Sequence, residues 1–358
     1  SGSGIITFTG DIGDTNAPQS GVIGTSNIGN TTTSDLNFES TLYSFDGGTT
    51  ITAASGDNID LNAQSPTTFE TAGDALTFGT SNIALSNGTN LSVTSTGGAI
   101  SIAGVVGDSD ETITINADGG STSTETVSIG DVGQSDHTDI HNLTITADDG
   151  ITLTGAIYTS ADSTSSGDVV FNDKVIIDGT ASIDTDNTGN TTSTDGLITF
   201  VGTIQAEGNG TDSLTLSSGA GTITLVEIGG SSKPLTSFTS TSNALTISND
   251  ITTNTGIIDI NAPVVLGADV VISTGAGTGN VDFSSTLTGS YDLDILSGSG
   301  NVIITGNIGL GGTPLTSLDI NQTGGTGDIT ISGNIGDSTT SGAGIVRIGN
   351  DSNTGTIT

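Results

Sequence analysis

A short phrase of glycine, β-branched and polar residues recurs along this chain of 358 residues. It occupies residues 298–309 and returns at residues 325–336 and 2–13, with weaker copies at 219–229 and 97–107. Each copy consists of a glycine turn, a brief run in which Ile, Val or Leu alternates mainly with Thr or Ser, a second glycine and a short apolar step. Repeated units of this kind are the sequence signature of solenoids and propellers, so the phrase constrains the architecture strongly.

Many further runs with the same alternation lie between these copies. Residues 113–115, 143–145, 214–216 and 329–331 each place one Thr between two aliphatic residues. Alternation with a period of two predicts short strands that bury one face. No run has the i, i+3, i+4, i+7 apolar spacing of an amphipathic helix, and 55 glycines disfavour helix formation. We therefore predict an all-β chain.

The length and spacing of these runs distinguish a propeller, a β-sandwich and a parallel β-helix from one another. Gly300 and Gly327 hold equivalent places in two successive copies of the phrase, and the interval between them is that of one solenoid coil. Propeller blades need about 40 residues or more, and β-sandwiches need longer strands. A parallel β-helix explains the brevity, because each strand forms one side of a narrow prism. We predict a solenoid of about 13–16 coils, at roughly 20–28 residues a coil.

The composition predicts a slim core. Hydrophobic residues make up 32% of the chain and aromatic residues only 3%, so large side chains are scarce. We expect Ile, Val and Leu to line the core and Thr to face outward. Residues 14–90 depart from the repeat, which leaves them open to a different local fold. We predict an irregular N-terminal β region at residues 1–95, continuous with the solenoid, and a β-helix repeat region at residues 96–358.

The charge balance excludes several partners. The chain has 3 Lys plus Arg against 39 Asp plus Glu, a formal net charge of −36. Nucleic acid binding depends on basic side chains that neutralise phosphates, so no nucleic acid partner is expected. Anionic membrane surfaces are disfavoured for the same reason. Every apolar run is far too short to cross a bilayer as a helix, so no membrane insertion is expected.

Two segments carry a more specific signal. Residues 229–238 and 309–320 join the end of the phrase to Pro-Leu-Thr-Ser and a following strand, with the prolines at Pro234 and Pro314. This pattern resembles the β-strand repeats of large bacterial surface exoproteins, of the filamentous-haemagglutinin-like adhesin or surface-layer type. The resemblance covers the last half of the chain well and the first third loosely. It implies a right-handed parallel β-helix at the cell surface, with an adhesive, matrix or surface-layer role.

The function predicted from these observations is non-enzymatic. We expect an extracellular structural or adhesive repeat protein that assembles end to end or laterally into a filament, sheath or surface layer. Both ends of the sequence fall within the repeat, so the expected partners are further copies or neighbouring repeats of a larger chain. Surface glycans are a further expected partner.

Two alternatives remain open. A polysaccharide lyase or hydrolase could use the same scaffold, but the basic residues that would hold an acidic substrate, Lys174, Lys233 and Arg347, are far apart in sequence. An inverting glycosidase needs two carboxylates, and no pair can be singled out among so many. An ice-binding protein would need Thr triplets in register on every coil, and the varying intervals between the triplets argue against that.

One segment resembles a calcium loop. Asp184, Asp186, Thr188 and Asp195 take the first, third, fifth and last places of a twelve-residue loop, and Gly189 takes the sixth. The segment departs from the EF-hand pattern in having Thr188 and Asp195 at those places and no flanking helices. Calcium is therefore the one candidate cofactor, but a solvated acidic loop is the favoured interpretation of this segment.

A histidine pair offers a second candidate for a metal. His137 and His141 have the i, i+4 spacing, with acidic residues beside them. That spacing brings two imidazoles together only on a helix, and residues 134–142 have the sequence of a loop. A polar insertion is therefore the favoured interpretation.

Overall fold

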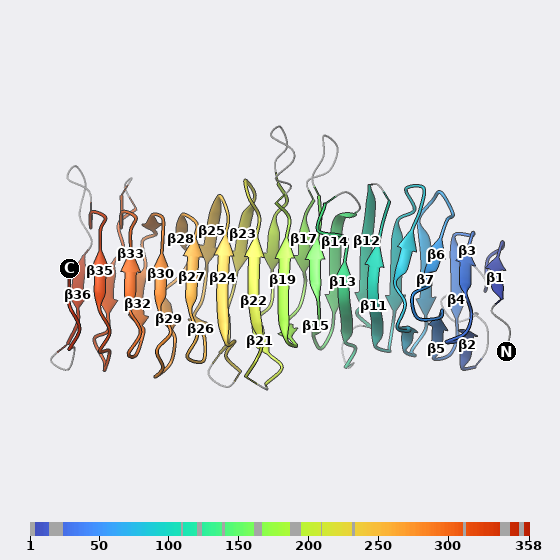
Figure 1. The fold of residues 1–358 in the computed structure, drawn as a ribbon, viewed down its shortest axis with the longest axis horizontal. Coiled ribbons are helices and arrows are strands. Elements are labelled where there is room, and N and C mark those ends of the chain that lie inside the picture. Colours follow the sequence, from blue (N-terminus) through green and yellow to red (C-terminus); the bar gives the residue numbers. More distant parts are fainter. Residues whose placement is uncertain are drawn as a thin grey trace. The chain divides into compact units, whose positions relative to one another are not determined.

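The parallel β-helix predicted from the sequence is confirmed by the computed structural model (Figure 1). The structure describes residues 4–13, 24–108, 110–119, 124–137, 140–160, 167–186, 195–208, 210–230, 233–310, 313–336, 344–350 and 354–358. These residues contain no helix, and their parallel strands stack in about 12 coils. The number lies just below the predicted range because some coils are long, such as the step from Ile113 to its partner Leu143. No helix suited to crossing a membrane is found among the described residues.

The chain divides into two compact units. The first comprises Ser1–Val175 with Asp184–Gly196, and the second comprises Ile176–Ile183 with Leu197–Thr358. The strands of the first unit are β1 (Ile5–Phe8), β2 (Ser26–Gly29), β3 (Asp35–Phe38), β4 (Leu42–Phe45), β5 (Thr49–Thr52), β6 (Ile59–Leu61), β7 (Thr67–Thr71), β8 (Leu76–Phe78), β9 (Ile83–Leu85), β10 (Leu91–Ser95), β11 (Ile100–Val106), β12 (Glu111–Ala117), β13 (Val127–Val132), β14 (Ile140–Ala147), β15 (Ile151–Leu153), β16 (Ala156–Tyr158) and β17 (Val169–Phe171).

The next two strands contain residues of both units, and all the strands after them belong to the second unit. The shared strands are β18 (Val175–Ile177) and β19 (Thr180–Asp184). The second unit contains β20 (Ile198–Phe200), β21 (Ile204–Ala206), β22 (Ser213–Ser217), β23 (Thr222–Leu225), β24 (Ser237–Thr241), β25 (Ala244–Ile247), β26 (Ile251–Thr252), β27 (Ile258–Asn261), β28 (Val264–Leu266), β29 (Val270–Ser273), β30 (Val281–Phe283), β31 (Leu287–Thr288), β32 (Asp292–Leu296), β33 (Val302–Ile304), β34 (Ser317–Ile320), β35 (Ile329–Ile331) and β36 (Ile345–Ile348).

Each coil of the first unit runs along three short sides, and every side is a parallel ladder. The first side pairs β2, β5, β8, β11, β13 and β15 in succession. The second pairs β1, β3, β6 and β9 and continues through the later residues of β11. The third pairs β4, β7, β10, β12, β14 and β17. Each side is only a few residues long because a turn must follow it.

The second unit repeats this plan. One ladder runs through β22, β24, β27, β30, β33 and β35. A second runs through β20, β23, β25, β28 and β31. The third runs through β26, β29, β32, β34 and β36. All of these pairings are parallel, as expected when each strand lies one coil above its partner.

Columns of apolar side chains, most of them aliphatic, fill the interior of both units. In the first unit one column follows the first side through Ile51, Phe78, Ile102, Ile129 and Leu153, which pair in register and are all buried. Period-two alternation directs these side chains inward and the intervening Thr and Ser outward. Burying one such side chain contributes about 1.5–3 kcal/mol, so many short strands together support the fold.

Aromatic residues gather in the first coils, which the sequence did not predict. The rings of Phe38 and Phe69 lie 5.1 Å apart edge to face, and Tyr43 stacks on Phe69 at 5.0 Å. Phe8 stacks on Phe38 at 5.0 Å, and Phe78 meets Phe69 at 5.1 Å. These spacings are typical of favourable aromatic pairs. The interior of these coils is therefore filled largely by aromatic rings and not by the predicted aliphatic side chains alone.

The turn-rich N-terminal segment adopts the same fold as the repeat that follows it. Strand β8 pairs with β11 and β10 pairs with β12, so the parallel ladders run on across residue 95. From β2 onward, the region left open by the sequence therefore consists of parallel coils like the later ones. The division between the compact units falls elsewhere, within residues 175–197.

Candidate functional site

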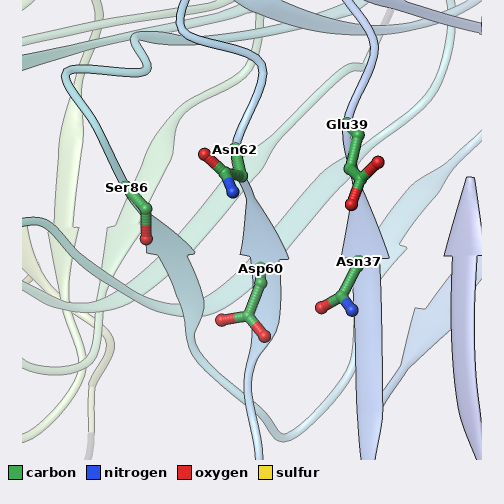
Figure 2. Close-up of a pocket in the computed structure, with 5 residues that line it drawn as sticks. All are labelled: Asn37, Glu39, Asp60, Asn62 and Ser86. Carbon is green, nitrogen blue, oxygen red and sulfur yellow. The ribbon is translucent and has the colours of Figure 1, made fainter. Parts of the chain in front are cut away.

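A polar recess lies on the outer face of the first unit, where β3, β6 and β9 end side by side (Figure 2). Its volume is about 220 Å³. The side chains that line it are those of Asn37, Glu39, Asp60, Asn62 and Ser86. The recess thus collects two carboxylates, two amides and a hydroxyl from three successive coils.

Strand alternation places these side chains on the outside. Phe38 and Leu61 are buried, so their neighbours in sequence point away from the core. The ladder also continues past the strand ends. The backbone N–H of Asn62 donates to the carbonyl of Phe38 at 3.0 Å, and that of Ser86 donates to the carbonyl of Leu61 at 3.0 Å. These bonds hold the lining residues at the spacing of the coils.

Hydrogen bonds at the rim orient both amides. The Asn87 Nδ2 group donates to Asn62 Oδ1 at 2.6 Å, and Asn87 itself sits in a left-handed turn with φ of 58°. On the other side, Asn37 Nδ2 donates to Thr7 Oγ1 at 3.4 Å. The N–H₂ group of Asn62 therefore remains available to a ligand. In Asn37, the amide oxygen remains available.

The carboxyl group of Asp60 is electrostatically perturbed. Partial burial, followed by the negative charge of Asp35, raises the pKa of Asp60 above its ordinary value. Both causes disfavour the ionised form. A carboxyl with a raised pKa in a recess is a typical feature of a functional site, although structural carboxyls show it too.

The lining restricts what the recess can bind. None of the five lining residues is basic, so an anionic ligand would meet two carboxylates without compensation. The amides and the hydroxyl supply both donors and acceptors. The recess is thus suited to an uncharged ligand rich in hydroxyl groups.

The predicted calcium loop is described only in part. Thr188 lies outside the described residues. Asp184, Asp186 and Asp195 are described, and burial followed by the charges of Asp195 and Asp184 raises the pKa of Asp186. The carboxylates of Asp184 and Asp195 therefore both disfavour the ionised form of Asp186. Among the described residues no group of three or more His, Cys, Asp or Glu side chains is placed to hold a metal ion, so calcium at this loop stays a prediction.

The two histidines contact different acids. His137 Nε2 lies 3.6 Å from Asp184 Oδ2, and His141 Nε2 lies 3.2 Å from Asp110 Oδ1. His137 occupies a turn with φ of 55°, whereas His141 is buried in β14. The hydrogen bond with Asp184 is the main cause that raises the pKa of His137. Neither histidine lies in a helix, so their i, i+4 spacing does not place them on one helical face.

Outward carboxylates stack on neighbouring coils of the second unit. Asp259 pairs in register with Asp282, and Asp294 pairs with Asp319. Burial, followed by the charge of the stacked partner, raises the pKa of both Asp282 and Asp294. Arg347 Nε donates to Asp319 Oδ1 at 2.7 Å. Its positive charge offsets the repulsion between Asp294 and Asp319. Like charges directly opposite in a ladder are destabilising.

Replacing Asp282 with asparagine is therefore expected to stabilise the protein at pH 7. The folded pKa of Asp282 lies above the unfolded value of about 3.8, so its stabilising contribution is complete below that value and is lost as the pH rises through the folded pKa. We expect a gain of a few tenths of a kcal/mol up to about 1 kcal/mol at pH 7, and none at pH 3. Urea titrations at both pH values measure it.

The control for this prediction removes the same charge from an exposed turn. Asp178 lies between β18 and β19 and is exposed. Asp178→Asn is expected to change the free energy of unfolding by less than about 0.5 kcal/mol at either pH. Equal stabilisation by both variants would attribute the effect to net charge rather than to the stacked pair.

Comparisons with protein-family models, with curated proteins and with solved structures find no match to this chain. A functional assignment therefore depends on the geometry described above.

The lining of the recess was missed by the sequence analysis. Asn37, Asp60 and Ser86 lie far apart in the sequence, and no motif joins them. Polar residues at strand ends are also typical of ordinary turns. The signal that could have found them is coil register: once Phe38 is aligned with Leu61 and Leu85, the residues around them fall on one outer surface.

Proposed function

We propose that this chain is a non-enzymatic structural or adhesive protein that acts outside the cell, where its outer faces bind polymeric surface glycans. The supporting observation is two rows of outward Thr and Ser side chains on the first unit, with one residue from each successive coil. We call these rows hydroxyl files. The first file, on the first side, consists of Thr50, Thr77, Ser101, Ser128 and Thr152, each in register with the next. The second file, on the third side, consists of Thr68, Ser92, Thr114 and Thr144.

The files suit a ligand that is itself repetitive. Neighbouring members are about 4.8 Å apart, the separation of paired strands. Each hydroxyl both donates and accepts hydrogen bonds, but a single exposed contact of this kind is weak. A polymer that engages several members at once gains avidity, by a factor of about 10²–10⁴ for linked contacts. A regular file thus favours polymeric over monomeric ligands.

The cellular placement and the assembly are part of the same proposal. The resemblance to bacterial surface exoproteins supports an extracellular location, and the net charge of −36 suits a protein exposed to salt. Self-assembly into a filament, sheath or surface layer stays a prediction. Negative-stain images of the purified chain test it, and dispersed single molecules at every salt and calcium concentration would contradict it.

Removing hydroxyls from one file is expected to weaken adhesion. In the triple variant Thr77→Ala, Ser101→Ala and Ser128→Ala, the backbone ladder remains while three contacts disappear. Retention on polysaccharide-coated surfaces should fall about tenfold or more, because avidity multiplies the individual losses. The corresponding triple variant of the second file, Ser92→Ala, Thr114→Ala and Thr144→Ala, should lower retention in the same way. Unchanged adhesion in both triple variants, or no adhesion of the parent chain, would contradict the proposal.

Ice binding is the second candidate, because the files keep their register despite unequal intervals. Along the first file, longer and shorter sequence intervals alternate from one member to the next, yet each member pairs directly with its successor. Turns absorb the difference in length, which removes the objection drawn from the sequence. An ice binder would show thermal hysteresis that is lost in a triple variant, whereas an adhesive protein would show none.

A further inference from the structure

The recess on β3, β6 and β9 combines donors and acceptors in a way that selects among ligands. Figure 2 shows the oxygen of Asn37 on the side nearer Asp60, and the nitrogen of Asn62 turned down toward the same residue. The carboxylate of Glu39 and the hydroxyl of Ser86 complete the lining. The recess thus presents three side-chain acceptors, one amide donor and one hydroxyl that serves as either.

This arrangement does not match a bare cation. Calcium takes six to eight oxygen ligands, and carboxylates and amide oxygens are its usual protein donors. The oxygen of Asn62 already accepts a hydrogen bond from Asn87, so Asn62 turns a donor N–H₂ group toward the recess. A donor group repels a cation. A ligand hydroxyl, in contrast, accepts from Asn62 while donating to a carboxylate.

An acidic sugar does not match either. Glu39 and Asp60 both line the recess, and no basic side chain is among the lining residues. A ligand carboxylate would face like charges at short range, which is costly in a partly desolvated site. The raised pKa of Asp60 is consistent with a site that already disfavours negative charge.

We propose that this recess binds one neutral sugar unit, whose adjacent hydroxyls hydrogen-bond to Asp60, Asn62 and Asn37. Its volume of about 220 Å³ is below the roughly 300–1,000 Å³ of sites that enclose drug-sized ligands. The recess therefore holds a single unit of a glycan chain. No aromatic side chain lines it, so we expect a dissociation constant on the order of 1 mM.

The sugar site rests on the proposed adhesive function for its biological meaning. Separate experiments test the site and the function, so one can be wrong without the other. The hydroxyl files belong to the first and third sides of the coil, whereas the recess belongs to the second. Loss of adhesion in a file variant tests the files. Loss of monosaccharide binding in a recess variant tests the site proposed here.

The test is a titration of the full chain, followed by NMR. The probes are the methyl glycosides of glucose, galactose and mannose, with glucuronic acid and calcium chloride as charged alternatives. We expect saturable binding of at least one neutral glycoside. Asp60→Ala should weaken it about tenfold or more, because a partly buried acceptor is lost. Asp60→Asn keeps one acceptor oxygen and relieves the repulsion from Asp35, so it should fold well and weaken binding less.

The matched control is Asp74→Ala, which removes a carboxylate from an exposed turn outside the recess. It should bind the glycoside like the parent chain. Three results would overturn the proposal: no neutral glycoside binds, calcium alone perturbs the residues of the recess, or the glycoside is cleaved to free sugar and methanol. Cleavage would assign Glu39 and Asp60 to a hydrolase, since such enzymes use paired carboxyl groups.

Discussion

Replacing Phe69 with alanine is expected to lower the free energy of unfolding by about 3–5 kcal/mol. Phe69 is fully buried and its ring meets those of Phe38, Tyr43 and Phe78 at 5.0–5.1 Å. The variant loses the burial of a large side chain and leaves a cavity that three rings cannot fill together. Each of those rings is fixed by the backbone of a different strand, so collapse is limited.

Urea titration followed by tyrosine fluorescence measures this loss, because Tyr43 stacks directly on Phe69. The conservative variant Phe69→Leu fills most of the space and should cost clearly less, about 1–2 kcal/mol. If Phe69→Ala were no more costly than the leucine variant, the aromatic cluster would not be a packed core. The first coils would then owe their stability to their backbone ladders alone.

Replacing Gly327 with alanine is expected to cost about 2–4 kcal/mol. A Cβ atom at Gly327 would lie 1.9 Å from the carbonyl oxygen of Gly300, and one at Gly300 would lie 1.9 Å from that of Gly279. These atoms are backbone, so no side chain can rotate away to relieve the overlap. Relief requires the coils to separate, which weakens the ladder of β33 and β35.

A glycine without such a neighbour provides the control for this substitution. At Gly48 the nearest atom to an added Cβ lies 3.9 Å away, and the backbone is not left-handed. Gly48→Ala should therefore be neutral or slightly stabilising, because alanine lowers the entropy of the unfolded chain. Thermal melting of both variants decides the point. Equal melting temperatures would contradict the close coil approach at Gly327.

The recurring glycines explain why the architecture was predictable. Gly300 and Gly327 occupy equivalent corners of successive coils, and the same close approach relates Gly306 and Gly333. A side chain is excluded at each of these corners, so glycine must return once per coil. In residues 24–90 close approaches also occur, as at Gly29 and Gly47, but there the repeat is hard to recognise in the sequence. The aromatic side chains of Phe38 and Phe69, which pack against each other in the buried core, also depart from the aliphatic pattern of the later coils.

The candidate site was not predictable in the same way. Its residues are joined by coil register, which depends on how many residues each turn absorbs. Asn37 stacks on Asp60 because Leu36 pairs with Ile59, and nothing near either polar residue in sequence indicates that pairing. In contrast, Asp184, Asp186 and Asp195 lie within twelve residues of one another, so the sequence alone indicates that they form a group.

The parallel stacking of coils is the central claim, and pulsed EPR distances test it most directly. The chain contains no cysteine, so pairs of spin labels can be attached at introduced cysteines without interference. The pair Thr50→Cys with Thr152→Cys spans four ladder steps in the first unit, and Thr199→Cys with Thr288→Cys spans four in the second. Both backbone separations should be about 19 Å, at one strand spacing per step. Clearly unequal distances, or distances far from this value, would contradict the β-helix.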